Sequence, residues 1–203
     1  MAWNDPNSIE RIKKAKCVLP DFYYFEHFIA EPKANALYQQ LLSLNWQQPT
    51  LTIFNKAHTI PRKQVYMGDK GTGYRYSHQL FLPEPWHASV LNLKNTLNNW
   101  FGTQFNAVLL NWYRCGEDKM GWHADDEAEL GFSPIIASVS LGAVRKFKIR
   151  ENNTKQVTDL PLANGSCLLM TGRSQENYQH SLPVQKRVVD GRINLTFRNV
   201  CGV

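Results

Sequence analysis

The sequence predicts a mostly β fold with helices: a double-stranded β-helix (jelly roll) backed by N-terminal helices. Apolar residues recur at helical spacing in two segments before residue 101, and short segments with β-strand patterns follow one another after residue 105. The length bounds the number of domains, because 203 residues with 43% hydrophobic residues suffice for one core and not comfortably for two.

Two helices are expected in the N-terminal half, each close after a proline that suits a first helical turn. The first follows Pro32 and the second follows Pro85. Their apolar residues recur three or four positions apart. In the first helix these residues are Ala34, Leu37, Leu41 and Leu44, and in the second they are Trp86, Val90, Leu93, Leu97 and Trp100.

The rest of the chain divides into three regions. Residues 1–20 are expected to be an irregular lead-in to a single domain over residues 21–203. Residues 50–83 are rich in aromatic residues, glycine and basic residues, and they predict strands and long loops. Residues 105–203 predict the jelly roll, with a turn at 151–153 and strands at 105–113, 135–141, 146–150, 166–171 and 192–198.

The composition argues against several classes of protein. Charged residues at 20% and aromatic residues at 12% indicate a globular chain. The four cysteines lie far apart without a CxxC pair, which excludes a zinc ribbon or dithiol motif, favours a reducing compartment and leaves room for one disulfide. The chain has neither a secretory apolar segment nor a membrane-spanning run. We expect an intracellular monomer, in the cytoplasm of a prokaryote or the nucleus of a eukaryote.

The charge is distributed unevenly. The net charge is +6, but segment 117–129 holds six acidic residues and one lysine, so the rest of the chain carries 22 basic and 11 acidic residues. A basic body around one acidic patch suggests a polyanion-binding surface near a site that attracts cations. An unevenly charged, solvated surface would give the same numbers, so charge alone leaves both interpretations open.

A His-x-Asp motif and a later histidine are candidate metal ligands. His123 and Asp125 lie two positions apart on an extended segment, so both side chains point the same way from Cα atoms about 6.6 Å apart. His180, in the loop-like sequence YQHSLP, supplies a second imidazole. Two imidazoles and one carboxylate are the ligands expected of non-haem Fe(II) oxygenases. Zinc accepts them too, so the triad alone leaves the metal open.

The strand at 192–198 favours an oxygenase. Its apolar residues Ile193, Leu195 and Phe197 share one face, and all its polar residues fall on the other. An edge strand with a solvated basic face would look the same. Facing a metal, however, two arginines, an amide and a hydroxyl would suit a dicarboxylate, because guanidinium groups pair with carboxylates. Asn111 and Tyr113 form a second polar pair on an apolar strand, which a bound polar ligand would explain.

Several ordered motifs make the chain similar to the AlkB family of Fe(II)- and 2-oxoglutarate-dependent oxidative dealkylases. It most resembles the branch that acts on duplex DNA. The likeness covers roughly residues 20–200. The motifs are NWY at 111–113, HADDE at 123–127, His180 and RINLTFR at 192–198, together with IPRKQVYMGD, GYRYS, ASVSLGAVRKF and LPLANGS.

The resemblance implies a role for each candidate residue. Iron, which reacts with O2, would be held by His123, Asp125 and His180. The cosubstrate 2-oxoglutarate would be bound by Asn111, Tyr113, Arg192, Asn194, Thr196 and Arg198. Residues 50–83 would recognise nucleic acid, with Ile53, Phe54 and Asn55 as a finger that enters the duplex. Tyr74, Tyr76 and Asp126 would line the base pocket, and Glu127 would help to attract a cationic base. Lys56 belongs to the same substrate-binding set, and phosphates would meet Arg62, Lys63, Arg75, Lys146 and Lys148.

The expected activity is therefore oxidative demethylation of 1-methyladenine and 3-methylcytosine in DNA, which releases formaldehyde, succinate and CO2 and repairs alkylation damage. Duplex DNA is the favoured partner, with single-stranded DNA also open. An RNA or single-strand demethylase is one alternative. A catalytically inactive jelly roll that binds nucleic acid is a second, and a protein or small-molecule hydroxylase fits the basic surface poorly.

Overall fold

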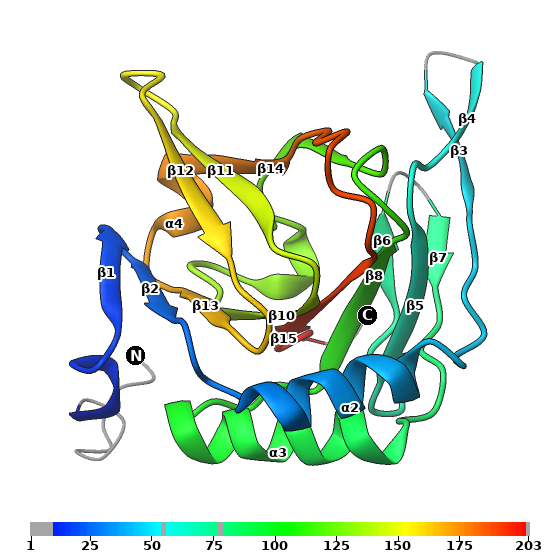
Figure 1. Cartoon of the computed structure of the whole chain (residues 1–203), viewed down its shortest axis with the longest axis horizontal. Coiled ribbons are helices and arrows are strands. Elements are labelled where there is room, and N and C mark those ends of the chain that lie inside the picture. The colour runs from blue at the N-terminus through cyan, green and yellow to red at the C-terminus, as the bar shows by residue number, and fades with distance from the viewer. Residues whose placement is uncertain (1–9, 54–55, 77–78, 202–203) are drawn as a thin grey trace.

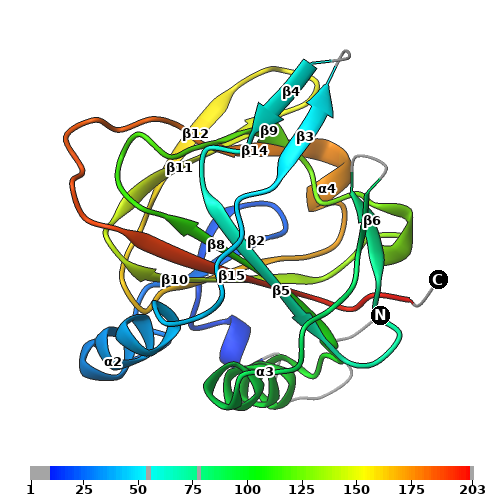
Figure 2. The same cartoon turned by 90° about the vertical axis from the view of Figure 1, so that its right-hand side faces the viewer.

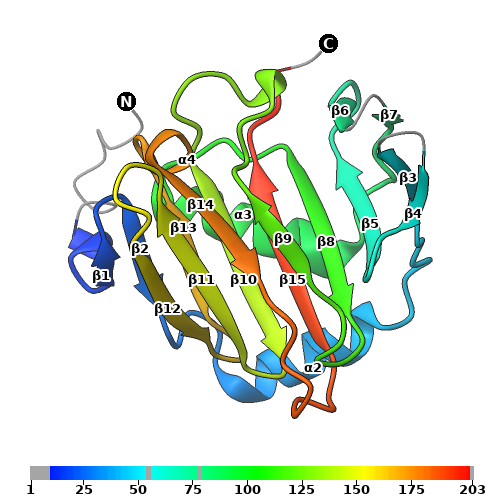
Figure 3. The same cartoon turned by 90° about the horizontal axis from the view of Figure 1, so that it is seen from above.

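The computed structural model describes residues 10–53, 56–76 and 79–201. Two antiparallel sheets face one another (Figures 1 and 3). The larger sheet has the order β1 (Lys16–Leu19), β2 (Phe22–Phe25), β13 (Cys167–Met170), β10 (Ile136–Gly142), β15 (Arg192–Arg198), β8 (Ala107–Tyr113) and β5 (Lys63–Gly68). The smaller has the order β12 (Val157–Leu162), β11 (Arg145–Glu151), β14 (Tyr178–Leu182) and β9 (Met120–His123). This is the predicted jelly roll.

Two helices cover the outer face of the larger sheet, as Figures 1 and 2 show. They are α2 (Glu31–Leu41) and α3 (Ala88–Phe101). Both were predicted, but α2 ends one turn earlier than expected, so that Leu44 lies beyond its end, and α3 begins at Ala88, so that Trp86 lies before its start. On α3 the buried residues Val90, Leu93, Leu97 and Phe101 join the core of the larger sheet. Gly102 ends α3 with a left-handed backbone (φ 63°), which glycine adopts at little cost.

Strand β15 lies in the middle of the larger sheet, between β10 and β8. Ile193, Leu195 and Phe197 join the core beneath the helices. Its polar side chains alternate with them and are also buried, so they face the interior between the two sheets. The alternative of an edge strand with a solvated basic face is therefore wrong.

Two hairpins flank β5 at one side of the sandwich (Figures 1 and 3). One pairs β3 (Thr50–Ile53) with β4 (Lys56–Thr59), and the other pairs β6 (Tyr74–Tyr76) with β7 (Gln79–Phe81). They confirm the strands expected in residues 50–83. Phe54 and Asn55 lie outside the described residues, and the side chains of Lys56, Tyr74, Arg75 and Tyr76 are not described.

Two local predictions were wrong. The lead-in is not irregular throughout, because residues 16–19 form β1 and pair with β2. A four-residue edge strand gives little periodic signal and forms through its neighbour. His180 lies in strand β14, not in a loop, and β14 pairs with both β11 and β9. The strand is not evident from the sequence YQHSLP, because several of its residues are polar. One of them, His180, faces the buried site, where a strand pattern would place an apolar residue.

Short helical segments complete the fold: residues 10–12, η1 (Ala128–Leu130) and α4 (Ser174–Asn177). All four cysteines are free thiols, so no disulfide links them. In the described part of the chain, each helix is too short or too polar to cross a membrane.

Candidate active site

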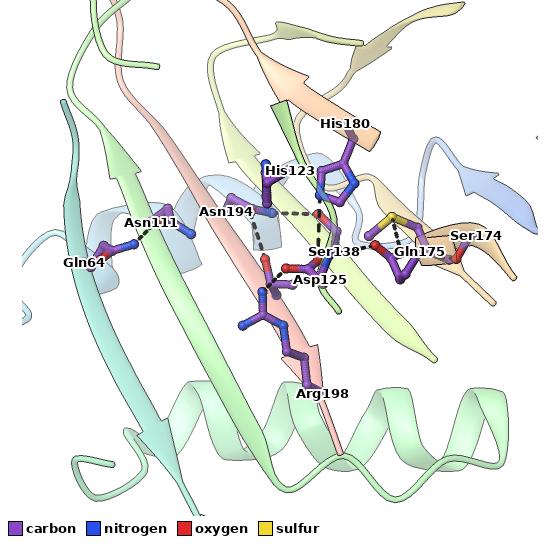
Figure 4. Close-up of polar contacts among 12 residues, drawn as sticks. Gln64, Asn111, His123, Asp125, Ser138, Ser174, Gln175, His180, Asn194 and Arg198 are labelled. Atoms are coloured by element: carbon purple, nitrogen blue, oxygen red, sulfur yellow. Dashed lines mark hydrogen bonds and ion pairs between the residues drawn. The ribbon is translucent and has the colours of Figure 1, made fainter. Parts of the chain in front are cut away.

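The three predicted metal ligands converge between the two sheets (Figure 4). His123 ends β9 and His180 lies on β14, where the two are paired in register. Their ring centroids are 4.2 Å apart. Asp125 lies two residues beyond β9, and the potential ligand atoms of all three side chains lie within 4.8 Å of one another. The structure thus brings together residues 57 positions apart in the sequence, in a geometry that one metal ion can occupy.

Each ligand is oriented by a neighbour. His123 Nδ1 lies 2.9 Å from the carbonyl oxygen of Gly121. A carbonyl can only accept, so Nδ1 carries the proton and Nε2 keeps its lone pair for a metal. The backbone N–H of Asp125 donates to Gln175 Oε1 at 2.9 Å. The ring of Phe147 lies 5.2 Å from that of His180. These contacts hold the ligands ready to bind metal.

The charge states also suit a divalent cation. Burial, followed by His123, lowers the pKa of His180 to about 3, so its imidazole is neutral at neutral pH. Burial alone would raise the pKa of Asp125, but Arg198 and the two histidines lower it below its ordinary value. Arg198 donates directly to Asp125 Oδ1. Metal binding needs unprotonated imidazole and carboxylate, and the site supplies both.

All six predicted cosubstrate residues line the same cavity as the triad. The lining residues include Arg62, Asn111, Tyr113, Glu127, Arg192, Asn194, Thr196 and Arg198. Asn111 Oδ1 accepts from Arg62 Nε and Gln64 Nε2, both at 2.8 Å, so its NH2 group remains to donate to a ligand. Asn194 is engaged within the protein, since it donates to Ser138 Oγ at 2.8 Å and accepts from Thr196 Oγ1 at 3.0 Å.

Arg192 provides the test of whether an anionic cosubstrate fits. It is 2% exposed, and its Nη2 donates to Ser140 Oγ at 2.8 Å. Its Nε is a buried donor without a hydrogen-bond partner, and no ion pair among the described residues includes Arg192. Burial lowers its pKa to about 10, so it remains a cation at neutral pH. A buried cation is costly without an anion, and a carboxylate in this cavity would supply one.

The predicted substrate-binding residues, unlike the cosubstrate residues, do not all line this cavity. Glu127 lines the metal cavity, whereas Asp126 is exposed and lines a neighbouring hollow with Gln175 and Gln179. The expectation that Arg62 contacts phosphates is wrong, because it is 4% exposed and its guanidinium faces the cavity. Its position beside the buried Asn111 explains this.

The surface lysines already have partners. Lys146 and Lys148 both pair with Asp159, at 2.9 and 2.6 Å, so phosphate would have to compete with that carboxylate. Lys63 lies over the ring of Trp112, with its Nζ 5.3 Å from the centroid. Phosphate contact by these three residues stays a prediction.

Four polar residues of the site were missed from the sequence. Ser138 and Ser140 alternate with buried apolar residues on β10, the same signal that singled out Asn111 and Tyr113, so they could have been found. Gln64 and Gln175 gave no comparable signal, because the contacts that join them to the site, with Asn111 and with the backbone N–H of Asp125, are to residues distant in sequence.

Comparisons with known proteins agree with this geometry. Residues 21–198 match the 2OG-Fe(II) oxygenase superfamily. The chain is 40% identical to human DNA oxidative demethylase ALKBH2 over 156 residues, 73% of this chain and 60% of that protein. It is 35% identical to the bovine alpha-ketoglutarate-dependent dioxygenase alkB homolog 3 over 206 residues, 96% of this chain and 68% of that protein. The chain belongs to the AlkB family.

The chain spans 56–65% of the length of the mammalian ALKBH2 proteins that it matches. Among solved structures, OsALKBH1 superposes with a TM-score of 0.64 at 17% sequence identity. The match covers 91% of this chain and 100% of the OsALKBH1 chain. A 2OG-Fe(II) oxygenase-family oxidoreductase from Burkholderia pseudomallei superposes with a TM-score of 0.62 at 15% identity, covering 96% and 91%. At these identities the superpositions support the fold alone.

Membership of the AlkB family implies Fe(II), 2-oxoglutarate and O2, and the residues present fit all three. The triad offers two imidazoles and one carboxylate, a ligand set that would leave coordination positions of a bound metal open. The cavity beside it contains the buried cation Arg192. A dicarboxylate that reaches from the metal to Arg192 would fill open positions on the metal and would also give the buried guanidinium an anionic partner.

Proposed function

We propose that the chain is an Fe(II)- and 2-oxoglutarate-dependent demethylase that removes N-methyl groups from 1-methyladenine and 3-methylcytosine in DNA, with formaldehyde, succinate and CO2 as products. The observation that carries the proposal is the triad next to a buried, unpaired Arg192 in one cavity. A catalytically inactive jelly roll that only binds nucleic acid would need neither the triad nor a buried, unpaired arginine beside it. Iron with 2-oxoglutarate and O2 supplies the oxidation, and the protein supplies binding and orientation.

The protein's own part begins with the cosubstrate. Arg192 would pair with its far carboxylate, while Ser140 accepts a hydrogen bond from the guanidinium and holds it in place. The NH2 group of Asn111 and the hydroxyl of Tyr113 would bind its oxygens from the neighbouring strand. Because these groups lie on adjacent strands of one sheet, they would orient the cosubstrate relative to the triad.

The acidic residues beside the triad support a cationic substrate. Glu127 lines the cavity, and its Oε2 is a buried acceptor without a hydrogen-bond partner. Asp126 lies next to it at the surface. Methylation at N1 of adenine or N3 of cytosine leaves the base positively charged, so these carboxyl groups would favour it over the unmodified base. The same methyl group blocks Watson–Crick pairing, which lowers the cost of flipping the base out of a duplex.

Recognition of DNA would involve the two hairpins beside β5. Phe54 would fill the gap left by the flipped base, as apolar wedges do in other DNA-bending proteins. Tyr74 and Tyr76 would stack on the base, and Lys56, Arg75 and Asp126 would complete the substrate-binding set. We propose a monomer as the acting form, for which the complete triad and cosubstrate set within one chain would suffice.

The test is formaldehyde release from oligonucleotides that carry one 1-methyladenine, with Fe(II), ascorbate and 2-oxoglutarate. Duplex DNA, single-stranded DNA and RNA of the same sequence are compared. We expect turnover on DNA, fastest on the duplex. Faster turnover on RNA would mean that RNA, not DNA, is the substrate of the same oxidative demethylation. Succinate formation without formaldehyde from any of the three would exclude nucleic-acid demethylation.

A further inference from the structure

Arg145, the first residue of β11, is fully buried, at 0% exposure, and it is the largest completely buried side chain among the described residues. Its guanidinium donates to four acceptors, the carbonyl oxygens of Cys115 (3.0 Å), Asp118 (2.9 Å) and Pro183 (2.8 Å) and the side-chain Oε1 of Gln185 (3.2 Å). None of the four is a carboxylate. A buried arginine whose N–H groups donate to backbone carbonyls fixes the position of the chain segments that carry those carbonyls.

The four acceptors come from two loops that both join the metal site to the cosubstrate site. The first loop, 114–119, runs from Tyr113 on β8 to β9, which carries His123. The second, 183–191, runs from β14, which carries His180, to Arg192 on β15. Arg145 therefore lies where both connections cross from one sheet to the other, and it sets the spacing between them.

The two loops also bind each other closely. Gly116 N donates to Val188 O at 2.7 Å, and Gln185 N donates to Gly116 O at 2.8 Å. A Cβ atom on Gly116 would lie 1.9 Å from the carbonyl oxygen of Gln185, so this approach requires glycine. The loops form one rigid unit, and Arg145 attaches that unit to the smaller sheet.

Arg145 also contacts a cosubstrate residue directly. Its Cζ lies 5.9 Å from the centroid of the Tyr113 ring, and the Cζ of Arg192 lies 5.5 Å from the same centroid. Both distances are within the range of cation–π attraction. The Tyr113 ring is thus held by two buried guanidinium groups, of which Arg192 faces the cosubstrate cavity and Arg145 does not line it.

We propose that Arg145 is a positioning residue for 2-oxoglutarate: it fixes the Tyr113 ring and the two loops, and thereby sets the affinity of the cosubstrate pocket without touching the cosubstrate or the metal. This inference rests on the proposed function. Because Arg145 contacts neither His123, Asp125 nor His180, its loss should leave metal binding unchanged. A general structural role would instead weaken both sites together.

The experiment measures binding directly. Wild-type protein and the variants Arg145→Lys and Arg145→Met are loaded anaerobically with Mn(II), and 2-oxoglutarate is titrated while tryptophan fluorescence is followed. We expect Arg145→Met to raise the Kd for 2-oxoglutarate at least about tenfold, equal to about 1.4 kcal/mol, and Arg145→Lys to raise it less. The Kd for Mn(II) should change by less than about twofold, which corresponds to about 0.4 kcal/mol. In steady state the KM for 2-oxoglutarate should rise far more than kcat falls.

The matched control is Arg114→Met, which removes the ion pair between Arg114 and Asp118 (2.8 Å) from the same loop but leaves Arg145 and Tyr113 in place. We expect its Kd for 2-oxoglutarate to match wild type. If the Arg145 variants do not fold, Gln185→Met removes one acceptor of Arg145 and should raise the Kd in the same direction, by a smaller factor.

The outcomes separate the two proposals. Wild-type protein that does not bind 2-oxoglutarate would overturn the proposed function. Wild-type binding with an unchanged Kd in folded Arg145 or Gln185 variants would overturn the positioning role alone. Parallel losses of Mn(II) and 2-oxoglutarate affinity would also overturn it, because they would show that Arg145 only stabilises the fold.

Discussion

Arg198 donates a hydrogen bond to Oδ1 of Asp125, so the last residue of β15 is paired with the metal ligand that follows β9. Both side chains are buried. From the sequence, Arg198 was expected to bind 2-oxoglutarate together with Arg192. In the structure the two arginines differ, because Arg198 has an anionic partner and Arg192 has none among the described residues. Arg192 is therefore the stronger candidate for the far carboxylate of the cosubstrate.

Replacing Arg198 with methionine should weaken metal binding. The substitution leaves Asp125 buried beside only the two histidines, its pKa rises, and protons then compete with the metal. Breaking a buried ion pair typically costs about 3–5 kcal/mol, so the melting temperature should fall as well. Titration with Mn(II), followed by electron paramagnetic resonance, measures the affinity. Arg192→Met is the control and should keep wild-type Mn(II) affinity. Equal affinities in wild type and Arg198→Met would contradict a role for Arg198 in holding Asp125.

Replacing Arg192 with methionine should raise the KM for 2-oxoglutarate. A hydrogen bond to a charged group contributes about 1.5–3 kcal/mol, which corresponds to roughly a tenfold to hundredfold change at about 1.4 kcal/mol per factor of ten. Saturating 2-oxoglutarate should restore most of the turnover. Lys33→Met, on the exposed side of α2, controls for loss of surface charge. An unchanged KM would assign the far carboxylate to Arg198 or Arg62.

Two adjacent carboxylates provide a sharp test of the metal site. Asp125→Asn should abolish turnover and Mn(II) binding, because Asp125 is buried within ligand distance of both histidines. Asp126→Asn should keep wild-type Mn(II) binding, since Asp126 is exposed and lines a different hollow. If Asp126 contacts the base, this variant raises the KM for the methylated oligonucleotide alone. Near-normal turnover by Asp125→Asn would mean that the triad is wrongly assigned.

These residues also show how far the sequence could predict the site. The alternation on β15 placed Arg192 and Arg198 on one face, and the structure confirms that face. Alternation carries no information about partners across the sandwich, so it could not separate an arginine that binds Asp125 from one that is unpaired. The fold was predictable because the seven-residue buried strands β8, β10 and β15 impose a strong pattern. Short or polar strands such as β1 and β14 form through their neighbours and were missed.

The metal-free protein should lose stability on acidification. His180 has an ordinary pKa of 6.5 in the unfolded chain and about 3 in the folded protein, where burial is the main cause. A lowered folded pKa means that the unfolded state binds the proton more tightly. The contribution of His180 is therefore fully present above pH 6.5 and falls away as the pH decreases towards 3.

The measurement is the melting temperature of metal-free protein in a series of buffers from about pH 7.5 to about pH 4. The ionic strength is held constant, so that the screening of charges does not change with pH. The variant His180→Gln, which has no titrating group at this position, should show a shallower decline than wild type. His27→Gln, at an exposed histidine, is the control and should follow wild type. Parallel curves for wild type and His180→Gln would show that His180 does not titrate as a buried neutral group.

Phe54 tests the choice of duplex DNA. It lies outside the described residues, in the chain between Ile53 and Lys56, which are paired at the ends of β3 and β4. A base-stacking aromatic contributes about 1–3 kcal/mol, so Phe54→Ala should slow repair of duplex DNA by roughly an order of magnitude or more at about 1.4 kcal/mol per factor of ten. Repair of the same lesion in single-stranded DNA, where no stack needs filling, should change little. The control is Val189→Ala, because Val189 is an apolar residue that is 78% exposed on the loop between β14 and β15 and should affect neither substrate. Formaldehyde release from paired duplex and single-stranded oligonucleotides gives both rates. Equal losses on the two substrates would place Phe54 in the base pocket or the protein core and remove the argument for a finger that enters the duplex.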